Sequence, residues 1–240
     1  MSKNIFNPAA DLAAANASFA GNSRTLIENF LDPAFASELA GELQLEQDWN
    51  LVFRDNNRHY DLHRTQWQAL TAETHQQLRQ RIVAVGQLGF QYWYYNIPLF
   101  DMVAQGHKVG ARSQEFYELL QSPEFIRRMR QVTGEDTIEF ADCQATKFNN
   151  GSFLSRHDDE VAGKNRRAAY VFGLSPQWRA DWGGLLTFPD NNASKGEYFL
   201  PQFNCLYLFK VPQPHLVSMV SPLATQERVS LTGWLRSGDA

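Results

Sequence analysis

The second half of the chain consists of short runs of β-forming residues separated by turn residues, and this pattern constrains the fold most strongly. From Thr137 onward the runs are IEFADCQATKF, FLSRHDD, RRAAYVFGL, GGLLTF, NCLYLFKV, HLVSMV and RVSLTGWL. Many short strands at this spacing are typical of a sandwich or a jelly roll. We find no internal repeat and therefore expect a double-stranded β-helix, which is a jelly roll, over residues 136–240.

Helical signals dominate residues 24–135, although Arg24–Phe30 (RTLIENF) predicts a short strand. Asp32 and Ser122 each precede a proline, and each pair can supply the N-cap and the first position of a helix. Apolar residues at helical spacing predict a long helix over residues 73–86. The predicted fold class is mainly β with a helical N-terminal half, so that α-helices flank a jelly-roll core.

Residues 1–23 are rich in Ala, Asn and Ser and contain few large apolar side chains. This composition predicts a flexible N-terminal arm, with a weak helix around Asp11–Ala20 as the alternative. The whole chain has 240 residues, of which 43% are hydrophobic. These values suit one domain with a substantial core, and we assign it to residues 24–240.

The net charge is -4, which excludes an overall basic footprint for nucleic acid. The two cysteines, Cys143 and Cys205, form no CxxC pair, so they indicate neither a disulfide scaffold nor a thiolate zinc site. No leader segment and no run of membrane-spanning length is recognised. We expect a cytoplasmic protein without nucleic-acid or membrane partners, and the sequence carries no signal for its oligomeric state.

The sequence His157-Asp158-Asp159 lies in or at the end of a predicted strand. Because side chains alternate in a strand, His157 and Asp159 should project to one face and Asp158 to the other. His215 follows in a late strand, which a jelly roll can bring beside an early one. Two histidines and one carboxylate that leave other positions open form the facial triad of non-haem iron(II) oxygenases.

Arg228 and Ser230 should share one face of the last predicted strand. A guanidinium group can bind a carboxylate through two parallel hydrogen bonds, and a serine hydroxyl can add a third. This pair suits the distal carboxylate of 2-oxoglutarate. The alternative for Arg228 is an ordinary surface ion pair at an edge strand.

A competing metal-ligand constellation occurs in His59-Tyr60-Asp61-Leu62-His63. It contains a second HxD pattern but has no carboxylate anchor downstream, so we interpret it as a loop, and a loop over a pocket is one form of this interpretation. Asp158 is the other rival ligand, and strand alternation argues against it. The aromatic run Tyr92–Tyr95 has two interpretations, as core or as the wall of a substrate groove.

These motifs together resemble the prolyl 4-hydroxylase-like branch of the 2-oxoglutarate/Fe(II) oxygenases, which includes the EGL-nine type and the ribosomal-protein prolyl hydroxylases. The resemblance covers most of the chain from Arg24. It is carried by HDD, RRAAYV, W followed by GGLLTF, PH and RVSLTGW, in the order and approximate spacing of the family. This combination is far more specific than any single piece.

The resemblance implies that His157, Asp159 and His215 ligate Fe(II), that Arg228 binds the C5 carboxylate of 2-oxoglutarate, and that Ser230 assists. It also makes Gly183-Gly184 a tight turn. Two departures concern tyrosine positions of the family, which are occupied here by Phe148 and Gly173. Lys147 and Tyr170 are the candidates to replace the missing hydroxyl contacts.

The implied activity is that of a dioxygenase that consumes O2 and 2-oxoglutarate, releases succinate and CO2, and hydroxylates a prolyl residue in a protein or peptide. Ascorbate is a candidate reductant. Free proline or another small molecule is the alternative substrate. A cupin-type metal-binding protein without catalysis is a second hypothesis, and an oxygenase acting on nucleic-acid bases or on an amino acid is a third.

Overall fold

The computed structural model describes residues 5–190, 192 and 194–238. Its helices are α1 (Leu12–Asn22), α2 (Pro33–Leu45), α3 (Arg64–Gln68), α4 (Ala72–Gly86), α5 (Leu99–Ala104), α6 (Ala111–Gln121), α7 (Pro123–Thr133) and the short 3-10 helix η1 (Ala180–Trp182). Its strands are β1 (Arg24–Ile27), β2 (Asn50–Asp55), β3 (Arg58–Leu62), β4 (Tyr92–Ile97), β5 (Phe140–Ala141), β6 (Gln144–Phe148), β7 (Phe153–His157), β8 (Arg166–Leu174), β9 (Leu186–Pro189), β10 (Gly196–Phe199), β11 (Phe203–Lys210), β12 (His215–Val217) and β13 (Arg228–Arg236).

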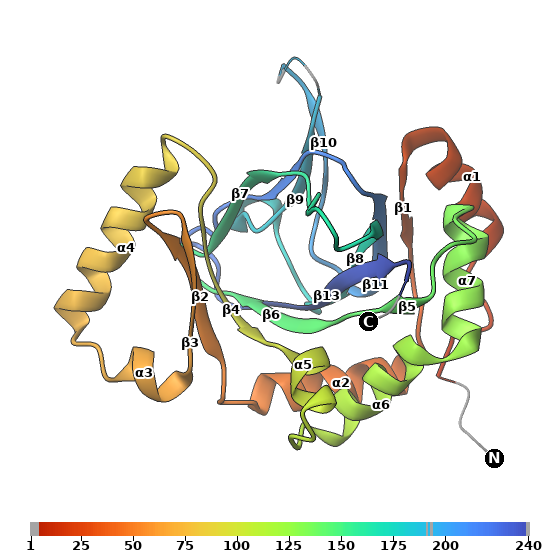
Figure 1. Ribbon diagram of the computed structural model, residues 1–240, viewed down its shortest axis with the longest axis horizontal. Helices are drawn as coiled ribbons and strands as arrows, with labels where there is room; N and C mark the ends of the chain where they lie inside the picture. Colours follow the sequence, from red (N-terminus) through yellow and green to blue (C-terminus); the bar gives the residue numbers. More distant parts are fainter. Residues whose placement is uncertain (1–4, 191, 193, 239–240) are drawn as a thin grey trace.

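The strands form one curled antiparallel sheet of the jelly-roll type, as the spacing of the β-rich runs predicts. The order along the sheet is β1-β11-β8-β13-β6-β4-β7-β12-β9-β10, with β2, β3 and β5 attached at its sides. The sheet curls so that β7 and β9 lie across the molecule from β8 and β11 (Figure 1). Helices α2, α5 and α6 lie along the outer side of β6 and β13, and the β9–β10 hairpin projects away from them.

The predicted helix starts are confirmed at both proline sites. The Asp32 side chain accepts hydrogen bonds from two backbone N–H groups in the first turn of α2. The Ser122 hydroxyl accepts one from the Phe125 N–H at the start of α7. Each cap satisfies backbone donors that no helix can satisfy within itself. No described helix has both the length and the apolar character that a membrane crossing requires.

The expectation of a mostly helical support over residues 24–135 is incomplete, because four strands of the sheet come from this region. β1 pairs with β11, and β4 lies between β6 and β7 in the sheet order. The segment without a clear period after Trp49 forms the hairpin of β2 and β3. Aromatic and charged residues mix there because β2 is mostly buried whereas β3 is half-buried to exposed.

The flexible arm expected over residues 1–23 is contradicted for residues 5–23, which pack onto the rest of the domain, and residues 1–4 lie outside the described residues. The alternative, a helix around Asp11–Ala20, is confirmed by α1. Phe6 forms an isolated bridge with Leu31. Helix α1 follows, with Asp11 as its N-cap, and Ala15 and Phe19 are buried in the main core. The alanines of this segment lie in a packed helix, because their small side chains allow α1 to lie close to its neighbours.

Candidate active site

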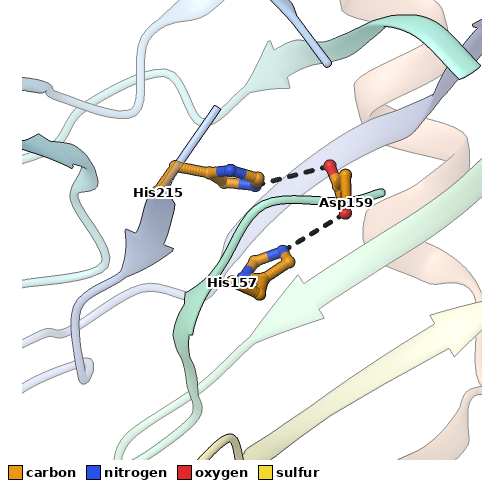
Figure 2. Close-up of side chains that lie close together, drawn as sticks. All are labelled: His157, Asp159 and His215. Atoms are coloured by element: carbon orange, nitrogen blue, oxygen red, sulfur yellow. Dashed lines mark ion pairs between the residues drawn. The ribbon is translucent and has the colours of Figure 1, made fainter. Parts of the chain in front are cut away.

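His157, Asp159 and His215 lie together on the inner side of the curled sheet. β7 and β12 pair with His157 opposite His215, so the two imidazole rings lie side by side, with centroids 4.1 Å apart. Figure 2 shows the Asp159 carboxylate facing both rings, with one oxygen directed at each. The Nε2 atoms of His157 and His215 lie 3.3 Å and 3.5 Å from those oxygens.

Both histidines are oriented by their own backbone. His157 Nδ1 lies 2.9 Å from the carbonyl oxygen of Ser155, and His215 Nδ1 lies 2.8 Å from that of Gln213. A carbonyl oxygen can only accept, so each Nδ1 carries the proton in this arrangement. The Nε2 atoms are then left with free lone pairs, which is the state in which imidazole binds a metal.

Asp159 reaches this position by a different route from the one strand alternation predicts. β7 ends at His157, and Asp159 has a φ of +65°, in the left-handed region. Aspartate tolerates this conformation better than most residues. Arg166 Nη1 donates to the Asp159 carbonyl oxygen at 2.9 Å, and the same guanidinium group lies over the Trp234 ring, 3.5 Å from its centroid. The turn thus holds the carboxylate between the histidines.

The charge states of the cluster suit a divalent cation. Burial lowers the pKa of His215 to about 4, so this ring is neutral at physiological pH. Burial favours a higher pKa for Asp159, but the adjacent His157 and His215 outweigh that effect and leave its pKa below the usual value. A carboxylate and two imidazoles with their donor atoms within 4.8 Å of one another match the facial triad of iron(II) sites.

Arg228 lies in the same cavity as the cluster. The cavity has a volume of about 610 Å³, and both the metal-ligand candidates and Arg228 line it. Arg228 is only 4% exposed, and its Nη1 atom has no hydrogen-bond partner among the described residues. Burial lowers the pKa of Arg228 to about 10, which still leaves it charged at neutral pH. A buried, incompletely paired guanidinium group is costly unless an anion joins it.

Ser230 shares the inward face of β13 with Arg228, as alternation predicts, but its hydroxyl lies 2.9 Å from the Thr146 hydroxyl. Thr146 lines the cavity and Ser230 is 1% exposed. The direct assistance of Ser230 to a co-substrate remains a prediction, and the structure offers Thr146 and Thr232 as nearer hydroxyls on the cavity wall.

The two positions that lack the family tyrosine have clear local explanations. A Cβ atom at Gly173 would lie 2.1 Å from the carbonyl oxygen of Gln202, so no larger residue fits there. Phe148 lies under the Arg228 guanidinium group, 5.1 Å from ring centroid to Cζ. Lys147 and Tyr170, the two candidates to replace the missing hydroxyl contacts, interact with other residues. Lys147 faces Glu227 on the other side of β6, and the Tyr170 hydroxyl donates to the Asp142 carbonyl oxygen at 2.8 Å.

The rival metal-ligand constellation does not assemble. His59 and Asp61 lie on strand β3, which replaces the predicted loop, and His63 caps helix α3. His59 does line the cavity, and its Nδ1 lies 2.8 Å from the Tyr92 hydroxyl. Among the described residues, the one potential metal cluster is that of His157, Asp159 and His215.

The turn predicted at Gly183-Gly184 is present between η1 and β9. Both glycines have positive φ, and a Cβ atom at Gly183 would lie 2.0 Å from the Met219 carbonyl oxygen. Only glycine fits such a position without displacing the backbone. The turn brings Trp178 and Val220 against Gly184, close to the Arg228 side chain.

Several residues of the cavity wall were not predicted as site residues from the sequence. They are Gln144, Thr146, Thr232 and Trp234 on β6 and β13, and Phe90 just before β4. Their common signal is alternation. On β4, Tyr92 and Tyr94 face the cavity, whereas Trp93 and Tyr95 belong to the core under the helices. The core interpretation of the aromatic run is therefore confirmed for Trp93 and Tyr95, while Tyr92 and Tyr94 line the cavity and their role as the wall of a substrate groove stays a prediction.

The comparisons with known proteins agree with this geometry. A model of the 2OG-Fe(II) oxygenase superfamily matches residues 143–236, which include His157, Asp159, His215 and Arg228. Mouse prolyl 3-hydroxylase OGFOD1 is 30% identical over 118 residues, or 46% of this chain and 21% of the mouse protein. The chain thus spans about a fifth of the length of that relative.

Solved structures share the fold. A prolyl-4-hydroxylase from Pseudomonas putida superposes with a TM-score of 0.61 at 19% identity, covering 95% of this chain and 100% of the other. A Trichoplax adhaerens prolyl hydroxylase in complex with a hypoxia-inducible factor peptide fragment gives 0.54 at 17% identity, covering 94% and 89%. Over residues 143–236 the chain is therefore similar to the 2OG-Fe(II) oxygenase superfamily, and its fold is that of solved prolyl hydroxylases.

Proposed function

We propose that this protein is an Fe(II)- and 2-oxoglutarate-dependent dioxygenase that hydroxylates a prolyl residue of a protein or peptide and releases succinate and CO2. The observation that carries the proposal is Arg228, a buried cation with an unpaired Nη1 atom in the same cavity as the His157, Asp159 and His215 cluster. A metal-binding protein without a co-substrate would gain nothing from a buried, unpaired guanidinium group.

In this proposal His157, Asp159 and His215 hold Fe(II), and Arg228 binds the C5 carboxylate of 2-oxoglutarate. Bound Fe(II) and 2-oxoglutarate supply the oxidising chemistry with O2. The chain's own contribution is to orient both imidazoles through their Nδ1 atoms, to hold the Asp159 carboxylate between them, and to surround the co-substrate with an apolar wall. That wall includes Leu186, Phe209 and Val217, which exclude water from the region near Arg228.

The prolyl substrate is supported by the similarity to proteins named prolyl hydroxylases and by the aromatic side of the cavity. Phe90, Tyr92 and Tyr94 present flat rings there, and a pyrrolidine ring packs well on such surfaces. A protein or peptide is the first candidate substrate, and free proline is the alternative. We further propose ascorbate as a useful reductant and the cytoplasm as the location.

The test uses purified protein with Fe(II), ascorbate and 2-oxoglutarate, and measures succinate with and without a library of proline-containing peptides. Mass spectrometry of the peptides identifies the product that gains one oxygen atom. We expect peptide-stimulated succinate formation in the wild type and none in His157→Ala. Metal binding without any succinate would instead favour a non-catalytic cupin-type protein, and stimulation by free proline alone would favour the small-molecule substrate.

A further inference from the structure

Strand β1 leaves one of its edges open. It stands at the end of the sheet order and pairs with β11 alone among the described strands. The Lys210 N–H donates to the Ser23 carbonyl oxygen at 2.9 Å, which identifies position 23 as a hydrogen-bonded position of this antiparallel pair. Every second residue bonds to the partner strand in such a pair, so Thr25 and Ile27 bond to β11, and the N–H and C=O of Leu26 point to the open edge. An open edge is a template for another extended chain.

A groove of about 560 Å³ runs along this edge. Residues 24–29 line it without interruption, whereas a groove over one face of β1 would be lined by alternate residues. Helix α1, which lies beside β1 (Figure 1), forms one wall, where Ala14, Ala15 and Ser18 present small side chains. Strand β10 forms the other wall with Phe199. The floor of the groove extends over about 20 Å of strand, which is the length of an ordinary β-strand.

The chain itself places a short extended segment at one end of the groove. The Asn7 N–H donates to the Phe30 carbonyl oxygen at 3.1 Å, and the Asp32 N–H donates to the Ile5 carbonyl oxygen at 2.8 Å. Asn7 also lines the groove, and from there the chain turns into α1. The N-terminal segment thus pairs with the residues that follow β1 and leaves the position beside Leu26 open.

The charge of the groove indicates what can fill it. Its charged lining residues are Asp11, Arg24, Glu28 and Glu197. Arg24 and Glu197 form an ion pair with each other. No described cation forms an ion pair with Asp11 or with the exposed Glu28, so the groove has an excess of negative charge. This excess complements lysine or arginine side chains.

The shape of the groove favours a single extended segment over a second copy of this chain. The β1 edge lies between α1 and β10, and a second copy would bring its own α1 and β10 to the same place. One extended segment meets no such obstacle and can form hydrogen bonds with the open edge at Leu26.

We propose that this groove binds an extended basic segment of a partner protein as an added strand beside β1. The segment forms main-chain hydrogen bonds with Leu26, as an extended peptide does when it joins an open sheet edge. Its lysine or arginine side chains lie near Asp11 and Glu28, and the small side chains of α1 leave room for its backbone. No described residue lines both this groove and the cavity of the candidate active site, so the inference goes beyond the proposed hydroxylation.

The experiment uses three capped octapeptides that carry fluorescein, and fluorescence anisotropy measures their Kd for the full chain. One peptide alternates lysine and valine, and one alternates glutamate and valine. The third is the lysine peptide with methylated backbone nitrogens, which keeps the charge and prevents strand pairing. We expect the lysine peptide to bind at least about tenfold more tightly than either control, because only this peptide has both the charge and free backbone N–H groups. Bound lysine peptide should also slow hydrogen exchange at the Leu26 amide.

Two exposed alanines of α1 provide a matched pair of variants. Ala14 lines the groove and Ala17 does not, so Ala14→Trp fills the groove while Ala17→Trp adds the same side chain elsewhere on the helix. We expect Kd to rise about tenfold or more in Ala14→Trp and to stay within about twofold in Ala17→Trp. Leu26→Pro removes the N–H of the open edge, which an edge strand tolerates, and should also weaken binding at least about tenfold. Melting temperatures check that each variant is folded, and Ala14→Trp decides the question alone if Leu26→Pro does not fold.

Three results would overturn the proposal by showing that no strand is added in the groove. They are no binding of the lysine peptide, equal Kd values of the lysine peptide and its methylated form, and equal Kd values of Ala14→Trp and Ala17→Trp. Sedimentation of the wild type at increasing concentration tests the other occupant. A dimer that Ala14→Trp dissociates would mean that a second copy fills the groove, and the partner segment would then be excluded. None of these measurements involves the metal cluster, so the proposed function stands or falls separately, on succinate formation.

Discussion

At the scale of single residues, the candidate site contains a buried charge and a backbone conformation that are each energetically unfavourable on their own. Arg228 is buried without a full set of partners, and Asp159 has a left-handed backbone. The sequence predicted both residues, but it predicted Asp159 for the wrong reason. Strand alternation required an extended chain through Asp159, whereas β7 ends at His157 and a turn carries the carboxylate back to the histidines. Local pattern cannot reveal this, because Arg166 from the next strand fixes the turn.

Arg228→Met should make the protein more stable without ligand and unable to respond to 2-oxoglutarate. Methionine fills a similar volume and removes a buried charge whose desolvation is not repaid, so we expect the free energy of unfolding to rise by about 1 kcal/mol or more. The melting temperature should increase by about 2–4 °C, and the further increase that 2-oxoglutarate gives the wild type should vanish. Thermal unfolding with and without 2-oxoglutarate measures both. A less stable variant would show that Arg228 is a structural residue.

Asp159→Asn should weaken metal binding without unfolding the turn. Asparagine keeps the shape of aspartate and also tolerates positive φ, so only the negative charge is lost. Titration with Mn(II) should show an affinity at least about tenfold lower, by analogy with the cost of losing a charged partner. Asp158→Asn is the matched control, because Asp158 is the exposed neighbour of Asp159 and the rival ligand that strand alternation argues against. An equal loss in both variants would reverse the assignment.

At the scale of elements, the sequence predicted helices and strands where neighbouring residues determine them, and it failed where contacts with distant segments determine them. β8 has the bounds of the run RRAAYVFGL, and the capped helices α2 and α7 start where their Pro residues indicate. β4 was ambiguous because both of its faces are aromatic. Its role became clear only from its position in the sheet, with core on one side and cavity on the other. The tightest constraints between elements are at glycines, where one strand approaches the backbone of another segment.

Gly173→Ala should destabilise the sheet. The added methyl group would lie 2.1 Å from the Gln202 carbonyl oxygen, a backbone atom just before β11, so the two segments would have to separate. Overpacking of this kind costs about 1–3 kcal/mol, which should lower the melting temperature by several degrees. Gly41→Ala is the control, since no atom lies within 4 Å of its added Cβ in helix α2. That variant should gain about 0.5–1 kcal/mol, and a loss equal to that of Gly173→Ala would refute the steric argument.

At the scale of the whole molecule, the N-terminal segment completes the domain instead of extending from it. β1 forms one edge of the sheet order, beside β11, and α1 closes over the core next to α7 (Figure 1). Asn16 Nδ2 donates to the carbonyl oxygens of Gln131 and Val132, which joins α1 to the last turn of α7. The sequence suggested an arm because its apolar residues are few. Those few are buried, and burial depends on partners more than a hundred residues away.

Phe19→Ala should therefore act as a core substitution although it lies near the start of the chain. The side chain is 4% exposed and belongs to the main core, so its loss should leave a cavity under α1. Such truncations cost about 3 kcal/mol or more, which predicts a melting temperature lower by about 6–12 °C. Leu45→Ala removes a side chain that is 81% exposed and should change stability by less than about 0.5 kcal/mol. A flexible arm would make the two variants indistinguishable, whereas a packed α1 requires that they differ. Helix α1 packs beside β1, at one end of the sheet order, whereas the metal cluster lies at β7 and β12, toward the other end. Phe19→Ala should therefore lower the stability of the protein, while its Mn(II) affinity at temperatures below unfolding stays unchanged.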